Sequence, residues 1–230
     1  MRFKKSLVIP CKDEGKEFSK ILQSFKSSVS NNTEIIIVLD SINDATYETI
    51  LPFLTDNIRI VISSSSGPAA AVKAGINDAT GQYICIAMGD GSDEPRDVEK
   101  LFSLLENGAD LAAGSRYMKD GKYIGKKNFK WFLSRLAGFI LYYFFRVGTK
   151  DSTNMFKAYS KNFLQKVSIE SNNGFTLGLE MVIKAKLYKL NVKEIPTIWT
   201  DRTFGNSKFN LKKYLPSYLF WVIRLIIRKK

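Results

Sequence analysis

The amino-acid sequence predicts an α/β fold in which a mostly parallel β-sheet is covered by helices on both faces. Short apolar runs alternate with segments of helical apolar spacing through the first half of the chain, as expected for parallel strands joined by helical crossovers. With 45% hydrophobic and 13% aromatic residues, the chain can build a packed core, which argues against global disorder. Its 230 residues fit one large domain or two small ones.

The first half is expected to contain five strands, each a short run of mainly apolar residues. They cover residues 6–10, 34–39, 58–63, 83–87 and 109–113. Helices are expected between them, at residues 14–28, 45–54, 69–79 and 96–105. The first helix illustrates the pattern, since Phe18, Ile21, Leu22 and Phe25 form one apolar face at helical spacing.

The second half is less regular, with a helix expected at 175–187 and a strand at 192–200. Two further apolar stretches, 131–147 and 214–227, are interrupted by arginine or proline, so neither offers the roughly 20 largely uncharged residues of a bilayer-spanning helix. The first fits a core helix or a helix in the plane of a membrane equally well. The second is flanked by basic residues on both sides and is expected to be a membrane-associating amphipathic tail.

Charge is divided unevenly between the two halves. Residues 1–110 carry 11 basic and 16 acidic side chains, a net of −5, whereas residues 111–230 carry 24 basic and 6 acidic ones, a net of +18. The basic half suits an anionic partner such as a phosphate or an anionic membrane surface. Nucleic acid is not expected, because the basic residues are mixed with long aliphatic stretches and no nucleic-acid motif is present.

The residue counts exclude several kinds of site. The chain has no histidine, which excludes a Ser-His-Asp triad, a Cys-His pair and a histidine-containing zinc site. Two cysteines, Cys11 and Cys85, cannot form a disulfide framework and favour a reducing compartment. Only a few apolar residues follow the basic start of the chain, so no signal peptide is expected. Neither the dinucleotide-binding nor the P-loop glycine motif is present.

Acidic residues follow three of the expected strands. Asp13 and Glu14 follow the first strand, Asp40 and Asp44 the second, and a loop with Asp90, Asp93 and Glu94 the fourth. A single acid at such a position is most often a helix cap. Ligands of parallel α/β sheets bind outside the carboxyl ends of the strands, so three acidic strand ends on one rim predict a divalent cation and a phosphorylated ligand.

Seven segments, in order along the chain, carry a resemblance to the family 2 glycosyltransferases, and more narrowly to the branch of dolichol-phosphate mannose synthases and polyprenyl-phosphate sugar transferases. They are LVIPCKDEG (7–15), IVLDSINDAT (37–46), GPAAAVKAGINDATG (67–81), MGDGSDEP (88–95), GADLAAGSRY (108–117), DSTNMFKAY (151–159) and EIPTIWTDRTFGNSK (194–208). The resemblance implies a GT-A fold and the transfer of a sugar, with inversion, from a nucleotide-diphosphate donor.

The resemblance also implies roles for individual residues. Asp40 is expected to accept hydrogen bonds from the base of the donor. The other residues expected to line the nucleotide slot are Pro10, Lys12, Glu14, Gly67 and Lys208. Arg116, Arg202 and Lys208 are expected to supply positive charge near the phosphates, where an arginine can clamp two oxygens.

The metal motif of the family is expected at residues 88–95, with Asp90 as a ligand of Mg²⁺ or Mn²⁺ that neutralises charge on the departing diphosphate. Met88 stands at the first acidic position of this motif, and a thioether is a poor ligand for a hard cation. The expected metal ligands are therefore Asp90, Ser92 and Asp93, together with the donor phosphates. Lys157 stands where the family has an arginine, which removes a bidentate fork.

Two acceptors fit the resemblance. A polyprenyl phosphate is already an anion and needs little help from a base, whereas a hydroxyl of a polysaccharide or lipid-linked glycan needs one, with Asp93 or Glu94 as candidates. A basic polyanion-binding module without enzymatic activity is a remote alternative. The expected organisation is a nucleotide-sugar half (1–115), an acceptor half (116–209) and a basic tail (210–230), on the cytoplasmic face of a membrane and with room for a membrane-protein partner.

Overall fold

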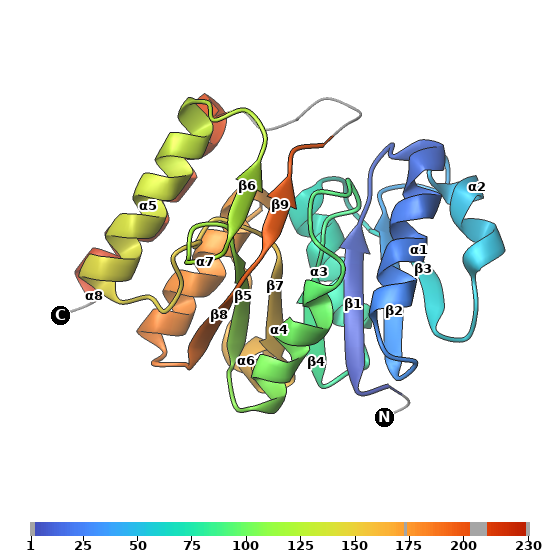
Figure 1. Cartoon of the computed structure of the whole chain (residues 1–230), viewed down its shortest axis with the longest axis horizontal. Helices are drawn as coiled ribbons and strands as arrows, with labels where there is room; N and C mark the ends of the chain where they lie inside the picture. The colour runs from blue at the N-terminus through green and yellow to red at the C-terminus, as the bar shows by residue number, and fades with distance from the viewer. Residues whose placement is uncertain (1–2, 173, 203–210, 229–230) are drawn as a thin grey trace.

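The computed structural model describes residues 3–172, 174–202 and 211–228 and shows a seven-stranded sheet between two layers of helices (Figure 1). The strand order is β3-β2-β1-β4-β7-β5-β8. The strands are β1 (Lys5–Pro10), β2 (Thr33–Leu39), β3 (Ile58–Ile62), β4 (Tyr83–Ile86), β5 (Leu111–Ser115), β7 (Lys157–Ser160) and β8 (Val192–Pro196). The sheet draws strands from both the 1–115 and the 116–209 segments, so the two halves share one core.

The five strands expected in the first half are confirmed, and β1 to β4 pair with one another in parallel. The departure is β7, which was not expected and lies antiparallel between β4 and β5. Lys157 opens this strand opposite Ile86 and Ala113. A four-residue strand that begins with lysine lacks the apolar run by which the other strands are recognised.

Each face of the sheet is covered because successive strand residues point to opposite sides. Leu7 and Ile9 pack with α1 (Phe18–Ser28), α2 (Tyr47–Ile50) and α4 (Asp97–Glu106). Val8, between them in sequence, packs on the other side with α3 (Pro68–Asp78) and α7 (Gly174–Leu187). Both layers bury a mainly apolar core, and the loops after the parallel strands gather at the carboxyl-end rim of the sheet.

Three expected elements differ in detail from the structure. The strand expected at 192–200 is two strands, because β9 (Ile198–Thr200) leaves the main sheet after Thr197 and pairs with β6 (Lys122–Ile124). The helix expected at 45–54 is only α2 followed by a 3₁₀ turn (Leu51–Phe53) that contains Pro52. The helix expected from residue 14 begins with a second 3₁₀ turn (Gly15–Glu17) before α1.

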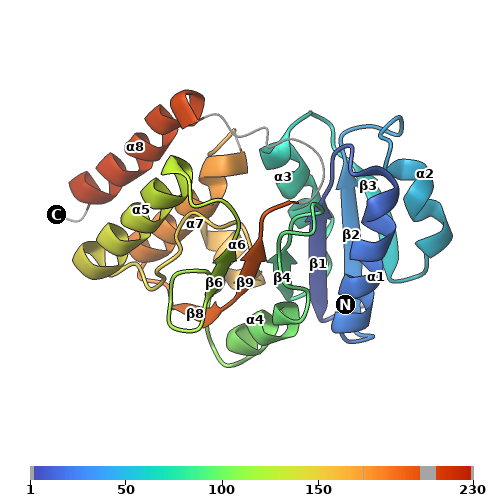
Figure 2. The ribbon, with the colours of Figure 1, turned by 45° about the horizontal axis from the view of Figure 1, so that its top comes forward.

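Two long helices, α5 (Phe129–Phe145) and α8 (Leu211–Arg228), lie at the same end of the molecule (Figures 1 and 2); a short helix, α6 (Lys161–Lys166), follows β7. The inner face of α8 buries Trp221 and Leu225 against the core that includes α7. Arg224 binds Glu170 at 2.6 Å, which anchors α8 to the loop before α7. None of the helices within the described ranges combines the length and the apolar character needed to cross a bilayer.

Candidate active site

The carboxyl ends of β1 and β2 bring Lys12 and Asp40 together. Lys12 Nζ lies 2.7 Å from Asp40 Oδ2, which also accepts a hydrogen bond of 2.7 Å from Ser66 Oγ. The backbone N–H of Gly67, at the start of α3, donates to both Asp40 oxygens at 3.2 Å. Partial burial raises the pKa of Asp40, but these hydrogen bonds outweigh it and leave the pKa below its usual value. Asp40 is therefore an ionised acceptor on the rim.

Asp44, four residues on, has a structural role. Its carboxylate accepts the backbone N–H groups of Asp13 and Thr46, at 3.1 Å and 2.8 Å for the shorter contacts. Thr46 Oγ1 in turn accepts the N–H of Glu14 at 3.0 Å. These bonds join the turn after β1 to the turn after β2, and Asp13 adopts a left-handed backbone conformation in this arrangement (φ 59°). Pro10, the last residue of β1, is buried beside them.

The expected metal motif, residues 88–95, follows β4 and meets β9 and the segment after it. Asp90 Oδ2 lies 2.5 Å from Arg202 Nη2, so two predicted site residues 112 positions apart in the chain form an ion pair. The backbone N–H of Thr200 donates to Ser92 O at 3.0 Å, and Trp199 forms an antiparallel bridge with Asp93. The loop is thus held at Asp90, Ser92 and Asp93 by β9 and by Arg202, which follows it.

Ser92 and Asp93 turn their side chains into the protein and are only 3% and 4% exposed. Asp93 Oδ2 accepts the N–H of Met88 at 2.9 Å, whereas Oδ1 is buried and has no hydrogen-bond partner among the described residues. Burial, with a smaller contribution from the charge of Asp90, raises the pKa of Asp93 to about 7. The geometry makes Asp93 a brace for the loop.

A divalent cation fits this rim through one carboxylate. Asp90 is partly exposed and offers the hard oxygen that Mg²⁺ and Mn²⁺ prefer. The structure shows no group of three or more acidic or cysteine side chains, within the residues it describes, that could enclose a metal ion. A cation held by Asp90 would need ligand phosphates and water for the rest of its coordination, as magnesium sites often do.

Arg116, directly after β5, is fixed by Asp151. Nε lies 2.6 Å from Asp151 Oδ2 and Nη2 lies 2.9 Å from Oδ1. Burial lowers the pKa of Arg116, but the charge of Asp151 outweighs burial and raises it. Nη2 also reaches Ser134 Oγ on α5 at 3.4 Å, and Ser134 is 2.7 Å from Thr153 Oγ1. The guanidinium is therefore held between β5, α5 and the loop before β7.

Lys157 is fully buried beneath that loop. Its ammonium donates to the carbonyl oxygens of Asp151 at 3.4 Å and Ser152 at 3.3 Å, and to that of Asn154. Burial lowers the pKa of Lys157 to about 7, against the opposing charge of Asp151. One side chain thus ties down the loop that presents Asp151 to Arg116.

Three residues of the site were not singled out from the sequence: Ser66, Asp151 and Trp199. Asp151 has a clear signal, because it is the only acidic residue between Gly121 and Ile169, in a strongly basic region. Ser66 lies in a run of four serines with nothing to distinguish it. Trp199 stacks on Tyr123 with ring centroids 4.9 Å apart. Lys208, which the sequence placed near the phosphates, lies outside the described residues.

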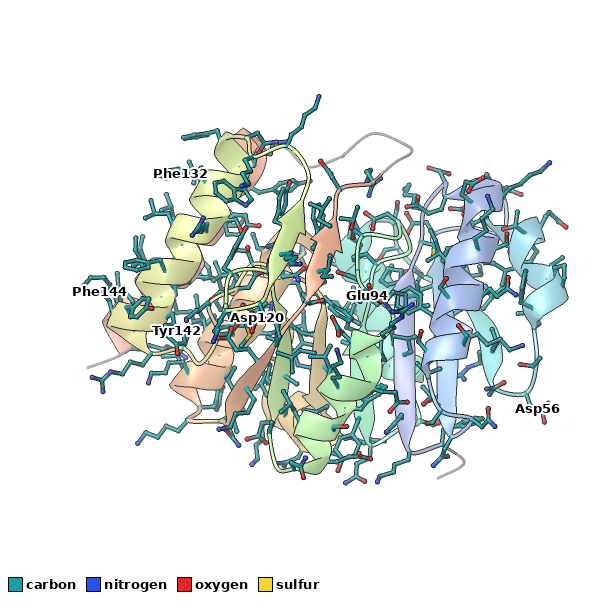
Figure 3. The ribbon with its side chains drawn as sticks, in the orientation of Figure 1. Asp56, Glu94, Asp120, Phe132, Tyr142 and Phe144 are labelled. Atoms are coloured by element: carbon teal, nitrogen blue, oxygen red, sulfur yellow. The ribbon has the colours of Figure 1, made fainter. Side chains whose placement is uncertain are left out.

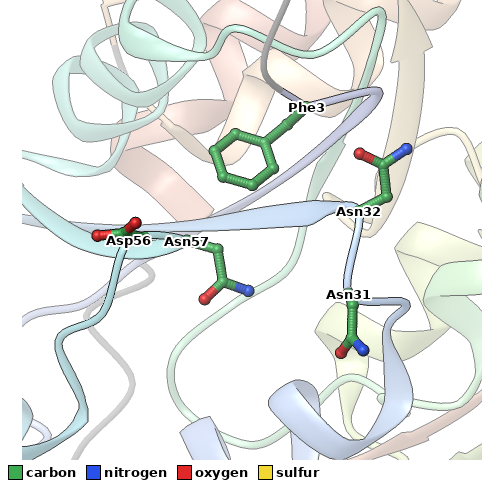
Figure 4. A pocket seen from close by; sticks show the side chains of 5 residues that line it. All are labelled: Phe3, Asn31, Asn32, Asp56 and Asn57. Atoms are coloured by element: carbon green, nitrogen blue, oxygen red, sulfur yellow. The ribbon is translucent and has the colours of Figure 1, made fainter.

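Two hollows lie on the surface of the described residues. The larger, of about 610 Å³, is at the amino ends of the strands and is lined by Phe3, Asn31, Asn32, Asp56 and Asn57 (Figure 4). The second, of about 460 Å³, runs along α3, and its lining includes Ser66, the residue whose hydroxyl donates to Asp40. The first is at the wrong edge of a parallel sheet for a substrate site, and the carboxyl-end rim remains the candidate.

The chain is similar in sequence to known sugar transferases. The chain is 28% identical over 229 residues to a dolichol-phosphate mannosyltransferase of Pyrococcus furiosus, covering 97% of this chain and 64% of that protein. It is 29% identical over 173 residues to a polyprenol monophosphomannose synthase of Mycolicibacterium smegmatis, covering 70% and 64%. The chain therefore spans slightly less than two thirds of the length of these relatives.

The fold is that of solved GT-A enzymes. Glucosyl-3-phosphoglycerate synthase of Mycobacterium tuberculosis, in complex with Mn²⁺, uridine diphosphate and glucosyl-3-phosphoglycerate, superposes with a TM-score of 0.70 at 15% identity, over 98% of this chain and 80% of that one. The glycosyl transferase family 2 model matches residues 6–168. Since this match covers most of the sheet and the rim that carries Asp40, Asp90 and Arg116, the chain belongs to glycosyl transferase family 2.

Proposed function

We propose that this chain is an inverting glycosyltransferase that moves a sugar from a nucleotide diphosphate to a polyprenyl phosphate at a membrane surface. The names of the two relatives support this acceptor. The observation that carries the proposal is that α5 both contacts Arg116 and exposes apolar side chains. Its Ser134 contacts the Arg116 guanidinium, while Phe132, two positions away, is 52% exposed and points away from the protein (Figure 3). One helix thus contacts the Arg116 guanidinium and carries an exposed apolar side chain.

On the donor side, Asp40 is the acceptor for the base, and Pro10, Lys12, Glu14 and Gly67 line the slot around it. Asp90 would hold Mg²⁺ or Mn²⁺, which neutralises charge on the departing diphosphate when it is bound. Arg202 already compensates the charge of Asp90 and is close enough to contact a diphosphate at this rim. Lys208 follows a few residues later and is proposed for the same role.

On the acceptor side, Arg116 is the proposed phosphate ligand. Its bonds to Asp151 and Ser134 use Nε and Nη2, which leaves the two N–H groups of Nη1 for acceptor oxygens. The phosphate oxygen is an anion and attacks without a base, so the lack of histidine is no obstacle. Asp151 keeps the guanidinium in place while the lipid tail lies along the membrane.

The membrane side of the proposal rests on α5 and α8. Exposed apolar side chains recur on α5 at Phe132, Leu136, Phe139 and Tyr143, at helical spacing, and a second row on α8 includes Leu219, Ile223 and Ile227. Exposed basic residues stand beside the first row, among them Lys130 and Arg135. Apolar faces bordered by basic residues are typical of helices that lie in an anionic membrane surface.

A second candidate is transfer to a sugar or glycerate hydroxyl, which the glucosyl-3-phosphoglycerate bound to the M. tuberculosis enzyme supports. Such an acceptor needs a base. Asp93 is poorly suited, because it is buried and one of its oxygens holds Met88 N–H. Glu94 stands at the same loop (Figure 3), but its carboxylate bonds to the backbone N–H of Arg96 at 3.3 Å. These contacts favour the phosphate acceptor.

The test is a transfer assay with Mn²⁺ and a panel of labelled uridine- and guanosine-diphosphate sugars. Each donor is offered with a short polyprenyl phosphate, the matching polyprenol, or a saccharide. Product in the polyprenyl-phosphate arm alone supports the proposal, and its loss in Asp90→Ala supports the role of the rim. Transfer onto the saccharide but not the lipid phosphate would replace the proposal with the second candidate.

A further inference from the structure

The short strand β9 lies between the two parts of the candidate site. Its backbone contacts the metal motif, where Trp199 forms a bridge with Asp93. The N–H of Thr200 donates to Ser92 O at 3.0 Å. The tryptophan side chain reaches the other part, because the guanidinium carbon of Arg116 lies 5.6 Å from the centre of the Trp199 ring. One residue of β9 therefore contacts the metal motif through its backbone and Arg116 through its ring.

Thr197, where the chain leaves the main sheet, fixes the start of β9. Its backbone N–H donates at 3.2 Å to the carbonyl of Ser115, the last residue of β5. Its buried hydroxyl donates to Asp97 Oδ2 on α4 at 2.7 Å, and its carbonyl accepts the N–H of Lys122 at 2.9 Å. Three elements thus anchor the backbone two positions before Trp199.

Tyr123 stacks on the Trp199 ring. The two residues are partners in the pair of β6 and β9, and their rings have centroids 4.9 Å apart and an interplanar angle of 16°. Arg116 lies within the distance of about 6 Å at which a guanidinium is attracted to an aromatic ring. The Arg116 side chain is only 10% exposed, and this attraction is stronger where water is excluded. Trp199 is therefore held by Tyr123 and in turn holds Arg116.

Transfer of a sugar between two phosphates needs a fixed spacing between them. In the proposed function, on which this inference rests, the departing diphosphate lies at Asp90 and the acceptor phosphate at Arg116. A misplacement of about 1 Å can lower the rate roughly 100-fold. We propose that Trp199 is a positioning residue, which holds Arg116 at a set distance from the metal motif and thereby aligns the acceptor phosphate with the donor.

Asp151 and Trp199 act on Arg116 in different ways. Asp151 pairs with Nε and Nη2 and fixes the orientation of the guanidinium. Trp199 belongs to the strand that binds the metal motif at Ser92 and leads into the ion pair with Asp90. Losing the Trp199 ring should therefore leave the pair of Arg116 and Asp151 in place and loosen its position relative to the donor.

The experiment compares Trp199→Leu and Trp199→Phe with the wild type in a transfer assay with labelled uridine- and guanosine-diphosphate sugars, Mn²⁺ and a short polyprenyl phosphate. We expect Trp199→Leu to lower kcat/KM for polyprenyl phosphate about tenfold or more, the effect of losing the attraction between a cation and a ring. Trp199→Phe keeps an aromatic face and should recover most of this loss. Calorimetry with uridine and guanosine diphosphate and Mn²⁺ should give unchanged dissociation constants, because the backbone contacts of β9 with the metal motif remain.

Ile198→Ala is the matched control. Ile198 is the neighbouring residue of β9, and its side chain, which is 37% exposed, points to the opposite face of the strand. A general loosening of β9 would therefore appear in this variant too. Tyr123→Leu removes the ring stacked on Trp199 without changing β9, and should lower the same kcat/KM by a smaller factor. It is the second variant if Trp199→Leu does not fold, which thermal melting detects.

The outcomes separate this inference from the proposed function. Unchanged kcat/KM in Trp199→Leu and Tyr123→Leu overturns the positioning role and leaves the proposed function standing. An equal weakening of nucleotide binding and of transfer, or an equal loss in Ile198→Ala, would show that Trp199 only stabilises the strand, which also overturns the positioning role. If the wild type transfers sugar from none of the donors to polyprenyl phosphate, the proposed function fails, and the positioning role fails with it.

Discussion

Arg116 and Asp151 meet at two points, with Nε 2.6 Å from Oδ2 and Nη2 2.9 Å from Oδ1. The backbone N–H of Arg116 donates to the same carboxylate at 3.0 Å. Asp151 is fully buried, and the side chain of Arg116 is 10% exposed. Because a bidentate pair fixes both position and plane, Asp151 holds the guanidinium of Arg116 in one orientation.

Asp151→Asn is expected to lower the free energy of unfolding by about 3–5 kcal/mol, because it leaves the buried Arg116 without its counter-charge. Urea denaturation measures this loss. Asp120→Asn is the control, since Asp120 is exposed and has φ 69°, a conformation that asparagine tolerates well. A loss below about 1 kcal/mol for Asp151→Asn would match a surface pair and contradict the role of the ion pair.

More of the fold than of the candidate site could be predicted from the sequence. Strands such as β2, with seven buried residues in a row, are evident from local apolar pattern. β7 and the split between β8 and β9 are not, because they depend on partners distant in sequence: β7 is completed by β4 and β5, and β9 by β6. Local pattern carries no information about such pairings.

Lys157→Met is expected to change how stability depends on pH. The lysine has a pKa of about 7 in the folded protein, against a value of 10.5 when unperturbed. Between these values the unfolded chain binds a proton that the native state does not, so the free energy of unfolding of the wild type rises with pH, by up to about 1.4 kcal/mol per pH unit. Asp151 and Asp93 oppose the shift, and Arg116 adds to it. The variant should lack this rise.

Urea denaturation at pH 7 and pH 10 measures the difference between Lys157→Met and the wild type. Lys166→Met, at the exposed end of α6, should follow the wild type. If the free energy of unfolding changed equally with pH in Lys157→Met and in the wild type, the buried ammonium would keep its proton throughout this range. Lys157→Arg keeps a positive charge near the three carbonyl oxygens. If Lys157 acts by positioning the loop, this variant should recover the sugar transfer that Lys157→Met loses.

Asp90→Ala is expected to abolish sugar transfer and to remove the Mn²⁺-dependent part of the thermal shift produced by a nucleotide diphosphate. A ligand stabilises the folded state more strongly the more tightly it binds to that state, so a metal bridge through Asp90 appears as an extra rise in melting temperature. Ser103→Ala, on the exposed side of α4, is the control. Wild-type turnover in Asp90→Ala would be incompatible with the proposed metal ligand.

The positions of Asp40 and Asp90 in the loops after β2 and β4 could be predicted from the sequence. The ion pair of Asp90 with Arg202 brings together two residues that the sequence assigned to one site, and their roles there stay predictions. From the sequence alone, a side chain that could bind a ligand could not be told from one that holds the loop in place. Ser92 and Asp93 are as polar as Asp90, yet the turn of the loop buries them, and the direction of a loop side chain depends on backbone geometry that residue type leaves open.

Leu136→Glu is expected to weaken binding to vesicles of mixed phosphatidylglycerol and phosphatidylcholine by about tenfold or more. Leu136 lies in the apolar row of α5 and is 40% exposed. Burying a leucine in an apolar phase stabilises by roughly 1.5–3 kcal/mol, and a glutamate in its place loses this gain and is repelled by the anionic surface.

Leu54→Glu is a matched control, because Leu54 is also a leucine with 40% exposure but precedes β3, at the other end of the sheet from α5 (Figure 1). Cosedimentation of both variants with vesicles measures the effect. Equal loss in the two variants would show that added negative charge alone weakens binding, and that α5 does not face the membrane.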